Sequence, residues 1–198
     1  MRENYRPFQI GKRFLIIPPD ISVEATDRHP LIMERGAFGS GEHETTRSCL
    51  ELLETLPSNN KRKILDLGSG TGILTIAALL LDSNSSAWCV DIDQTAVNSC
   101  QRNCKLNGFN LQIKHLCATL ETLDEKGFDL ILANIYGDIL LDIAATLVEK
   151  AAPGAYILLS GILWEYNFDV KKTYQNLGCK LHKSRLLDEF CTLLLQKP

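Results

Sequence analysis

The sequence has no long hydrophobic run, no zinc-type Cys-x-x-Cys pair and no excess of basic residues. Residues 1–20 contain no stretch apolar enough for a signal peptide or a membrane anchor, so we expect a cytoplasmic protein with no membrane partner. The formal net charge of −3 gives no electrostatic reason to expect strong nucleic-acid binding. The seven cysteines lack metal-type spacing, which predicts reduced thiols that pack as small apolar side chains and no metal site.

Internal repeats, low-complexity tracts and linkers rich in proline and serine are also absent from the sequence. A chain of 198 residues that is 45% hydrophobic and 23% charged is typical of one globular domain, which needs no metal or disulfide to form a core. We therefore expect an N-terminal linker or extension over residues 1–35 and one main domain over residues 36–198.

From residue 63 onward the sequence shows a regular alternation of short apolar segments with helical ones. Strands are expected at 13–17, 63–67, 87–91, 111–116, 128–133 and 155–160, and helices at 42–56, 72–82, 93–107, 137–150 and 164–176. This order predicts βαβ units, hence an α/β fold with a mostly parallel, doubly wound sheet covered on both faces. Two further strand-like segments, 178–186 and 190–196, follow each other directly and predict a C-terminal antiparallel hairpin at one edge.

A glycine-rich turn follows the expected strand 63–67. Gly68, Gly70 and Gly72 alternate there before a helix, as a chain requires where it turns tightly and lets a ligand approach its backbone. A dinucleotide fingerprint, GxGxxG, would need a glycine at Ile73, so an NAD-linked dehydrogenase is disfavoured. Asp66 stands just ahead of the turn, where a carboxylate suits a cationic sulfonium ligand better than a pyrophosphate.

An acidic residue closes the next expected strand, in the segment AWCVDID. Asp91 stands where a carboxylate can accept hydrogen bonds from both ribose hydroxyls of an adenosine. Asp93 is expected to cap the following helix instead. The alternative is that Asp91 only stabilises the turn after the strand and binds no ligand.

The expected strand 128–133 ends in LANIYGD, at the edge of the sheet that carries the glycine turn. The side-chain carbonyl of Asn134 can accept a hydrogen bond from an amine, and the ring of Tyr136 can approach a methyl-bearing cation. We interpret both as catalytic residues of nitrogen methylation by in-line displacement, a reaction driven by positioning and desolvation. The alternative is a helix-start turn with Asn134 as the cap.

The segment GAFGSGEHETTRSCLELL precedes the first strand of this alternation. Its clustered glycines and Phe38 are typical of a loop that folds over a ligand. Thr45 or Thr46 could cap the helix that follows. His43 could act as a general base, but we favour a role in positioning the amino-acid end of a cofactor.

Together, AFGSGEHETT, DLGSGTGILTIAA, VDIDQTAV, LANIYGD and LLSGIL resemble the PrmA-type methyltransferases, which modify amino groups of a stalk protein of the large ribosomal subunit. The resemblance spans nearly the whole chain, including RPFQIGKRFLIIPP. It implies a Rossmann-like class I methyltransferase domain over residues 36–198, S-adenosyl-L-methionine as cofactor, and lysine or N-terminal amines as acceptors. The candidate cofactor-binding residues are Phe38, Gly39, His43, Thr46, Asp66, Gly68, Gly70, Gly72, Asp91, Ile92 and Asn134.

The resemblance has two departures. That family usually carries a separate N-terminal domain that holds the ribosomal protein, and this chain starts where such a domain would have ended. IMERGAFG also stands where the family tends to show an Asp-Pro-Gly turn. A protein substrate, such as a ribosomal protein, remains our first expectation. The alternatives are a methyltransferase for nucleic-acid or small-molecule amines, and a cofactor-binding module without catalysis.

Overall fold

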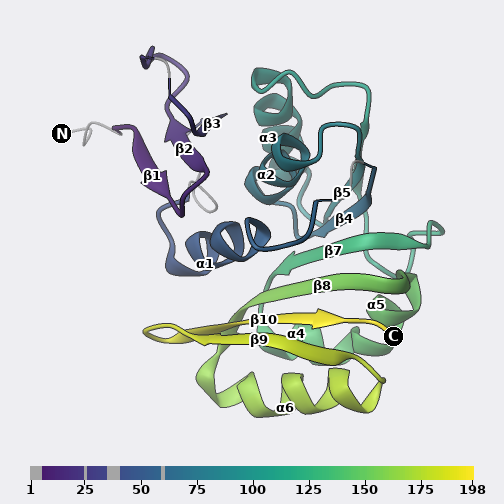
Figure 1. The fold of residues 1–198 in the computed structure, drawn as a ribbon. Helices are drawn as coiled ribbons and strands as arrows, with labels where there is room; N and C mark the ends of the chain where they lie inside the picture. The colour runs from purple at the N-terminus through teal and green to yellow at the C-terminus, as the bar shows by residue number, and fades with distance from the viewer. Residues whose placement is uncertain (1–5, 25, 35–40, 59–60) are drawn as a thin grey trace.

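The computed structural model describes residues 6–24, 26–34, 41–58 and 61–198. Its larger sheet has seven strands in the order β6-β5-β4-β7-β8-β10-β9 (Figure 1). These strands are β4 (Lys63–Leu67), β5 (Ser86–Asp91), β6 (Ile113–Cys117), β7 (Phe128–Asn134), β8 (Ala151–Leu163), β9 (Lys180–Leu186) and β10 (Phe190–Gln196). The helices are α1 (Glu44–Leu53), α2 (Ile73–Leu81), α3 (Gln94–Leu106), α4 (Gly137–Asp142), α5 (Ala144–Lys150) and α6 (Trp164–Asn176).

The sheet is doubly wound, as predicted. Strands β6, β5, β4, β7 and β8 are parallel, whereas β10 pairs antiparallel with both β8 and β9. From β4 the chain moves outward to β5 and β6 and then returns to β7 on the other side of β4. In such sheets, ligands bind outside the carboxyl ends of the strands at the point where the order reverses. That point here lies between β4 and β7.

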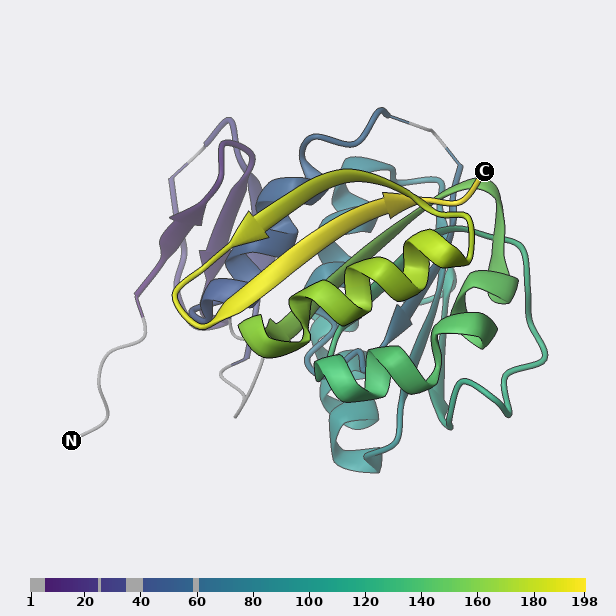
Figure 2. The same ribbon diagram turned by 90° about the horizontal axis from the view of Figure 1, so that it is seen from below.

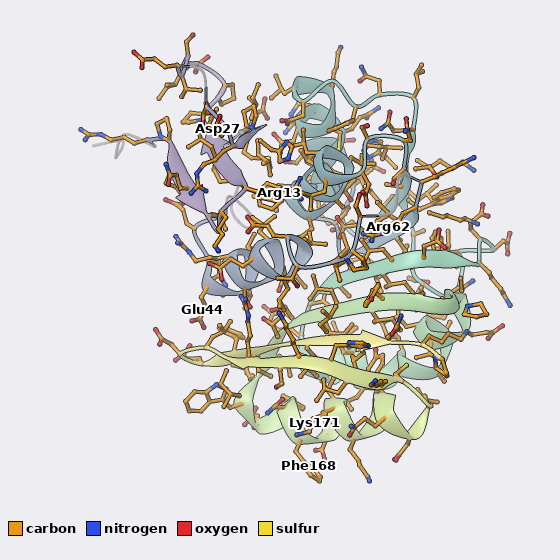
Figure 3. The ribbon with its side chains drawn as sticks, viewed as in Figure 1. Arg13, Asp27, Glu44, Arg62, Phe168 and Lys171 are labelled. Atoms are coloured by element: carbon orange, nitrogen blue, oxygen red, sulfur yellow. The ribbon has the colours of Figure 1, made fainter. Side chains whose placement is uncertain are left out.

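Two hydrophobic cores lie on the two faces of this sheet, because alternate residues of each strand point to opposite sides. On β4, for example, Ile64 packs with α1, α2 and α3, whereas Leu65 packs with α4, α5 and α6. Figure 2 shows α6 crossing this second face beside α4 and α5. The outer side of α6 faces away from the sheet, where the side chains of Phe168 and Lys171 project in Figure 3.

A second, three-stranded sheet precedes α1. It consists of β1 (Phe8–Ile10), β2 (Phe14–Ile17) and β3 (His29–Ile32), of which only β2 was predicted. Ile10, Phe14 and Leu31 are fully buried in the core that also contains α1 and α2. The extension therefore packs against the main domain. The proposed boundary at residue 35 falls outside the described residues and stays a prediction.

Most predicted elements differ from the observed ones by at most three residues at either end, and two differ by more. The single helix expected over 137–150 is interrupted at Ile143, which ends α4 and precedes α5. Strand β8 begins at Ala151 rather than 155, because Ala151 pairs with Phe128 before a register shift after which Tyr156 pairs with Leu130. Within the described part of the chain, none of the helices has the length and apolarity needed to cross a bilayer.

Candidate active site at the strand ends

The glycine turn between β4 and α2 adopts the backbone conformation that its sequence predicts. Gly68, Gly70 and Gly72 have φ values of +69°, +53° and +80°, a region that residues with a side chain rarely adopt. A Cβ on Gly68 would lie 2.4 Å from Cγ2 of Ile135, so the turn approaches the end of β7 closely. The backbone N–H groups of Gly68 and Ser69 donate to the carbonyl of Val90, which joins the turn to β5.

Asp66 lies at the base of this turn and is only 1% exposed. Its Oδ2 accepts hydrogen bonds from the Thr75 hydroxyl (2.6 Å) and the Thr75 backbone N–H (3.2 Å). The carboxyl therefore satisfies a donor in the first turn of α2, which has no capping side chain of its own. Burial raises the pKa of Asp66 to about 8, although the Thr75 hydrogen bonds act in the opposite direction.

Asp91 ends β5 and connects two loops of the site. Its Oδ2 accepts from the backbone N–H of Gly70 at 2.9 Å, and its Oδ1 accepts from that of Asp93 at 3.0 Å. The carboxylate is half-buried, whereas the next residue, Ile92, is 78% exposed. Asp93 caps α3 through the Thr95 backbone N–H, as predicted. Asp91 thus presents its oxygens at the mouth of the glycine turn, beside an exposed apolar side chain.

Asn134 ends β7 and contacts the start of α1. Its Nδ2 lies 3.3 Å from Thr45 Oγ1 and 3.5 Å from Thr46 Oγ1. Both threonines are nearly fully buried, so their hydroxyls hold the amide in one orientation. Among the described residues, no hydrogen bond is found to its carbonyl oxygen, Oδ1. An amide held by its nitrogen leaves that oxygen as an acceptor.

His43 caps α1, so the expectation that Thr45 or Thr46 would do so is wrong. Its Nδ1 accepts from the Thr45 backbone N–H at 3.3 Å and lies 2.8 Å from the Thr45 hydroxyl. Its ring meets that of Phe190 edge-on, with centroids 5.3 Å apart. The helix begins at Glu44, so Thr45 and Thr46 lie inside its first turn, where their hydroxyls meet Asn134. His43 therefore positions Thr45, which in turn positions Asn134.

The turn after Asn134 leads into α4, whose N-terminus has no side-chain cap. Tyr136 is 65% exposed and precedes α4 without a side-chain capping bond, so Asn134 is not the cap of that helix. Gly161 of β8 has a φ of +76°, and a Cβ there would lie 2.6 Å from the carbonyl oxygen of Ile135. Position 161 therefore requires a glycine, because a side chain there would collide with the backbone of the turn at Ile135.

Most of the candidate residues gather at the carboxyl ends of three neighbouring strands. The glycine turn follows β4, Asp91 ends β5 and Asn134 ends β7. Thr46 contacts Asn134 from α1, and His43 contacts it only through Thr45. Phe38 and Gly39 lie outside the described residues. Sequence reasoning missed three contributors: the Thr45 hydroxyl as an orienting group, Thr75 and Gly161. Thr75 had a visible signal, since it is the only polar residue of α2.

The chain matches a family model described as ribosomal protein L11 methyltransferase (PrmA) over residues 1–198. It is 42% identical over 171 residues to the ribosomal protein L11 methyltransferase of Trichlorobacter lovleyi, covering 83% of this chain and 55% of that protein. The protein of the same name from Synechococcus elongatus is 35% identical over 202 residues, covering 98% of this chain and 66% of the relative. The chain thus spans between about half and two thirds of the length of these relatives.

The fold has a solved counterpart in the ribosomal protein L11 methylase of Lactobacillus delbrueckii subsp. bulgaricus. The two structures superpose with a TM-score of 0.86 at 24% identity, over 99% of this chain and all of the other. The methyltransferase fold expected from the sequence is therefore confirmed. With the family match over its whole length, the chain belongs to the ribosomal protein L11 methyltransferase (PrmA) family.

Proposed function

We propose that this chain transfers a methyl group from S-adenosyl-L-methionine to an amino nitrogen of a protein, with a ribosomal protein of the L11 type as the first candidate. The observation that supports this most strongly is Asn134. Its amide is held by two threonine hydroxyls at the point where the strand order reverses. The carbonyl oxygen of the amide is left as an acceptor at the same end of the sheet as the glycine turn and Asp91, and we take the space outside these strand ends as the proposed cofactor crevice.

The residues present fit this cofactor. The Gly70 side of the turn is open, since a Cβ there would meet no atom nearer than 3.9 Å. The buried Oγ of Ser69 has no hydrogen-bond partner among the described residues, and such orphaned groups commonly await a ligand. Asp91 would accept from the ribose hydroxyls, and the exposed Ile92 would cover the adenine. Gly68 and Gly72 would shape the turn, with Asp66 fixing it to α2.

The bound cofactor would supply an electrophilic methyl group on a sulfonium. The chain's own residues would orient the nucleophile: Asn134 Oδ1 would accept a hydrogen bond from the amine, so that the nitrogen lone pair faces the methyl group. Tyr136 would line the entrance with its exposed ring. Phe38, Gly39, His43 and Thr46 would complete the cofactor pocket. A protonated amine has no lone pair to offer, so the rate should rise with pH until the amine's pKa in the site is passed.

The protein acceptor rests on the family relationship. The relatives that match this chain carry the name ribosomal protein L11 methyltransferase, and the mildly acidic net charge of −3 does not favour a nucleic-acid acceptor. We therefore propose transfer to an exposed amine that can reach the crevice at Asn134.

Calorimetric titration of the protein with S-adenosyl-L-methionine tests the first half of the proposal. We expect saturable binding that Asp91→Ala weakens and that Gly127→Ala, a change at the amino end of β7 opposite to Asn134, leaves intact. Absence of binding to the wild-type protein at millimolar cofactor would contradict the proposal.

Incubation with methyl-labelled cofactor tests the second half. The acceptors offered would be purified ribosomal protein L11, total ribosomal proteins and bulk RNA, each in a separate reaction. We expect label on protein amines, located by mass spectrometry of peptides. Label in RNA alone would favour the nucleic-acid alternative, and tight cofactor binding without any product would favour a module that only binds.

A further inference from the structure

A second cluster of chemically active side chains lies beneath the glycine turn, apart from the crevice. Cys89 on β5 is the direct register partner of His115 on β6, so both side chains point to the same face of the sheet. Cys100 and Cys104 lie four residues apart on α3, which packs on these two strands. A pair from the helix therefore faces a pair from the sheet.

The spacing of these groups matches a metal-binding site. The Sγ atoms of Cys89 and Cys100 and a ring nitrogen of His115 all lie within 4.8 Å of one another. The Sγ atoms of Cys100 and Cys104 are 3.9 Å apart. A tetrahedral ion with Zn–S bonds of about 2.3 Å would hold two thiolates about 3.8 Å apart. The separation of the Cys100 and Cys104 sulfurs is close to this edge length. Cys104 does not belong to the group whose ligand atoms all lie within 4.8 Å of one another, so its side chain would have to rotate to complete a four-ligand site.

The surroundings favour a ligand over simple packing. The three cysteines are at most 1% exposed, whereas His115 on the edge strand β6 is only partly buried. The buried Nδ1 of His115 has no hydrogen-bond partner among the described residues. A polar ring atom in that position is costly unless something satisfies it.

We propose that Cys89, Cys100, Cys104 and His115 form a structural binding site for a thiophilic divalent cation, Zn²⁺. Three thiolates and one imidazole are a donor set typical of closed structural zinc sites. On binding, each coordinating thiol would release its proton to solvent, and the imidazole would bind through a neutral nitrogen. Sequence spacing could not reveal this site, because its ligands come from two strands and a helix rather than from a Cys-x-x-Cys loop.

The site would brace the proposed cofactor turn. A Cβ placed on Gly72 would lie 2.6 Å from Cys100 Sγ and 3.4 Å from Cys104 Sγ, so the cluster is in direct contact with that turn. Thr75, which Asp66 binds, also lies 3.2 Å from Cys89 Sγ through its hydroxyl. A metal here would fix the start of α2 relative to β5 and α3 without touching the substrate.

The test is reconstitution of the full, reduced chain with Zn²⁺ and with Co²⁺ after removal of metal by a chelator. We expect about one Zn²⁺ per chain by elemental analysis, a rise in Tm with Zn²⁺, and thiolate-to-cobalt charge transfer with tetrahedral Co²⁺ absorption bands. Cys100→Ser should abolish the charge-transfer signal. Cys179→Ser, which changes a buried thiol outside the cluster, should leave it unchanged.

His115→Gln is the deciding variant, because its side chain is partly exposed and its loss should not prevent folding, which circular dichroism would check. We expect it to alter the cobalt bands and remove the Zn²⁺-dependent rise in Tm. The proposal is overturned if the reduced wild type gives no thiolate–cobalt signal, or if His115→Gln gives the wild-type spectrum and stoichiometry. Formation of a Cys100–Cys104 disulfide by a chain that takes up no metal when reduced would also overturn it. Titration of the metal-free protein with S-adenosyl-L-methionine measures cofactor binding without the metal. A failure of the zinc proposal can then be told apart from a failure of the proposed methyl transfer.

Discussion

Gly72→Ala should destabilise the protein through two separable effects. Gly72 has a φ of +80°, and an L-residue in this left-handed region costs about 1–2 kcal/mol. The new Cβ would also lie 2.6 Å from the buried Sγ of Cys100, and forcing an extra carbon into a packed core costs about 1–3 kcal/mol. The sum is a loss of about 2–5 kcal/mol in the free energy of unfolding.

Gly108→Ala is the matched control for the backbone effect. Gly108 has the same φ of +80° but no atom within 4 Å of a built Cβ, so it should lose only the backbone cost of about 1–2 kcal/mol. Urea denaturation of both variants, with chelator in every sample, would give the difference. A Gly72→Ala variant no less stable than Gly108→Ala would refute the predicted clash.

A double-mutant cycle then locates the clash. Cys100→Ala removes the sulfur that the new Cβ would meet, so the double variant Gly72→Ala/Cys100→Ala should lose less stability than the sum of the single changes. Additive losses would mean that Cys100 is not the obstacle, and the packing of α3 against the turn would have to be reconsidered.

Three further predictions follow from the site and its scaffold. The pKa of Asp66 in the folded protein is raised to about 8, so the stability that its neutral form contributes, on the order of 5 kcal/mol, is fully present below about pH 4 and is lost as the pH rises toward 8. Urea denaturation from pH 4 to 8 should therefore show a steeper fall in the free energy of unfolding for the wild type than for Asp66→Asn. Parallel curves would refute the interpretation of Asp66 as a buried, protonated carboxyl group. Asn134→Ala should lower turnover much more than cofactor affinity, whereas Asp91→Ala should lower affinity by about tenfold or more; calorimetry and initial rates would separate the two, and equal effects would mean their roles are misassigned. Arg62 and Asp82 form a buried ion pair at 3.2 Å (Figure 3 labels Arg62), so Asp82→Ala should cost about 3–5 kcal/mol in thermal or urea unfolding, and a loss below about 1 kcal/mol would indicate that the pair behaves as an exposed one.

The regular part of the fold was predictable because its signals are local. Apolar runs of strand length, separated by helical segments, fix a parallel sheet, and two adjacent strand-like segments near Asp188 indicate the hairpin. The break at Ile143 gave no such signal, since α4 and α5 together read as one helical pattern. Strand β1 was missed because it has only three residues, and β3 because Pro30 interrupts its short apolar pattern.

The candidate site was predictable to the same degree. Strand ends place Asp91 and Asn134 near the glycine turn by topology alone, so their proximity follows from sequence order. The contacts that orient them depend on tertiary packing: nothing in the sequence indicates that Thr45 reaches across from α1 to Asn134. His43 as a helix cap was equally hidden, because the two neighbouring threonines are more usual in that position.

Strand β10 lies between β8 and β9 although it is synthesised after both. As the chain emerges from the ribosome, β9 has no neighbour to pair with until residues 190–196 follow it, and the β8 edge stays open during the same interval. The apolar segment CTLLL of β10 closes both gaps at once. Completion of the sheet therefore waits until residues 190–196 have been made, and loss of this strand would leave the β8 edge open and β9 without a paired neighbour.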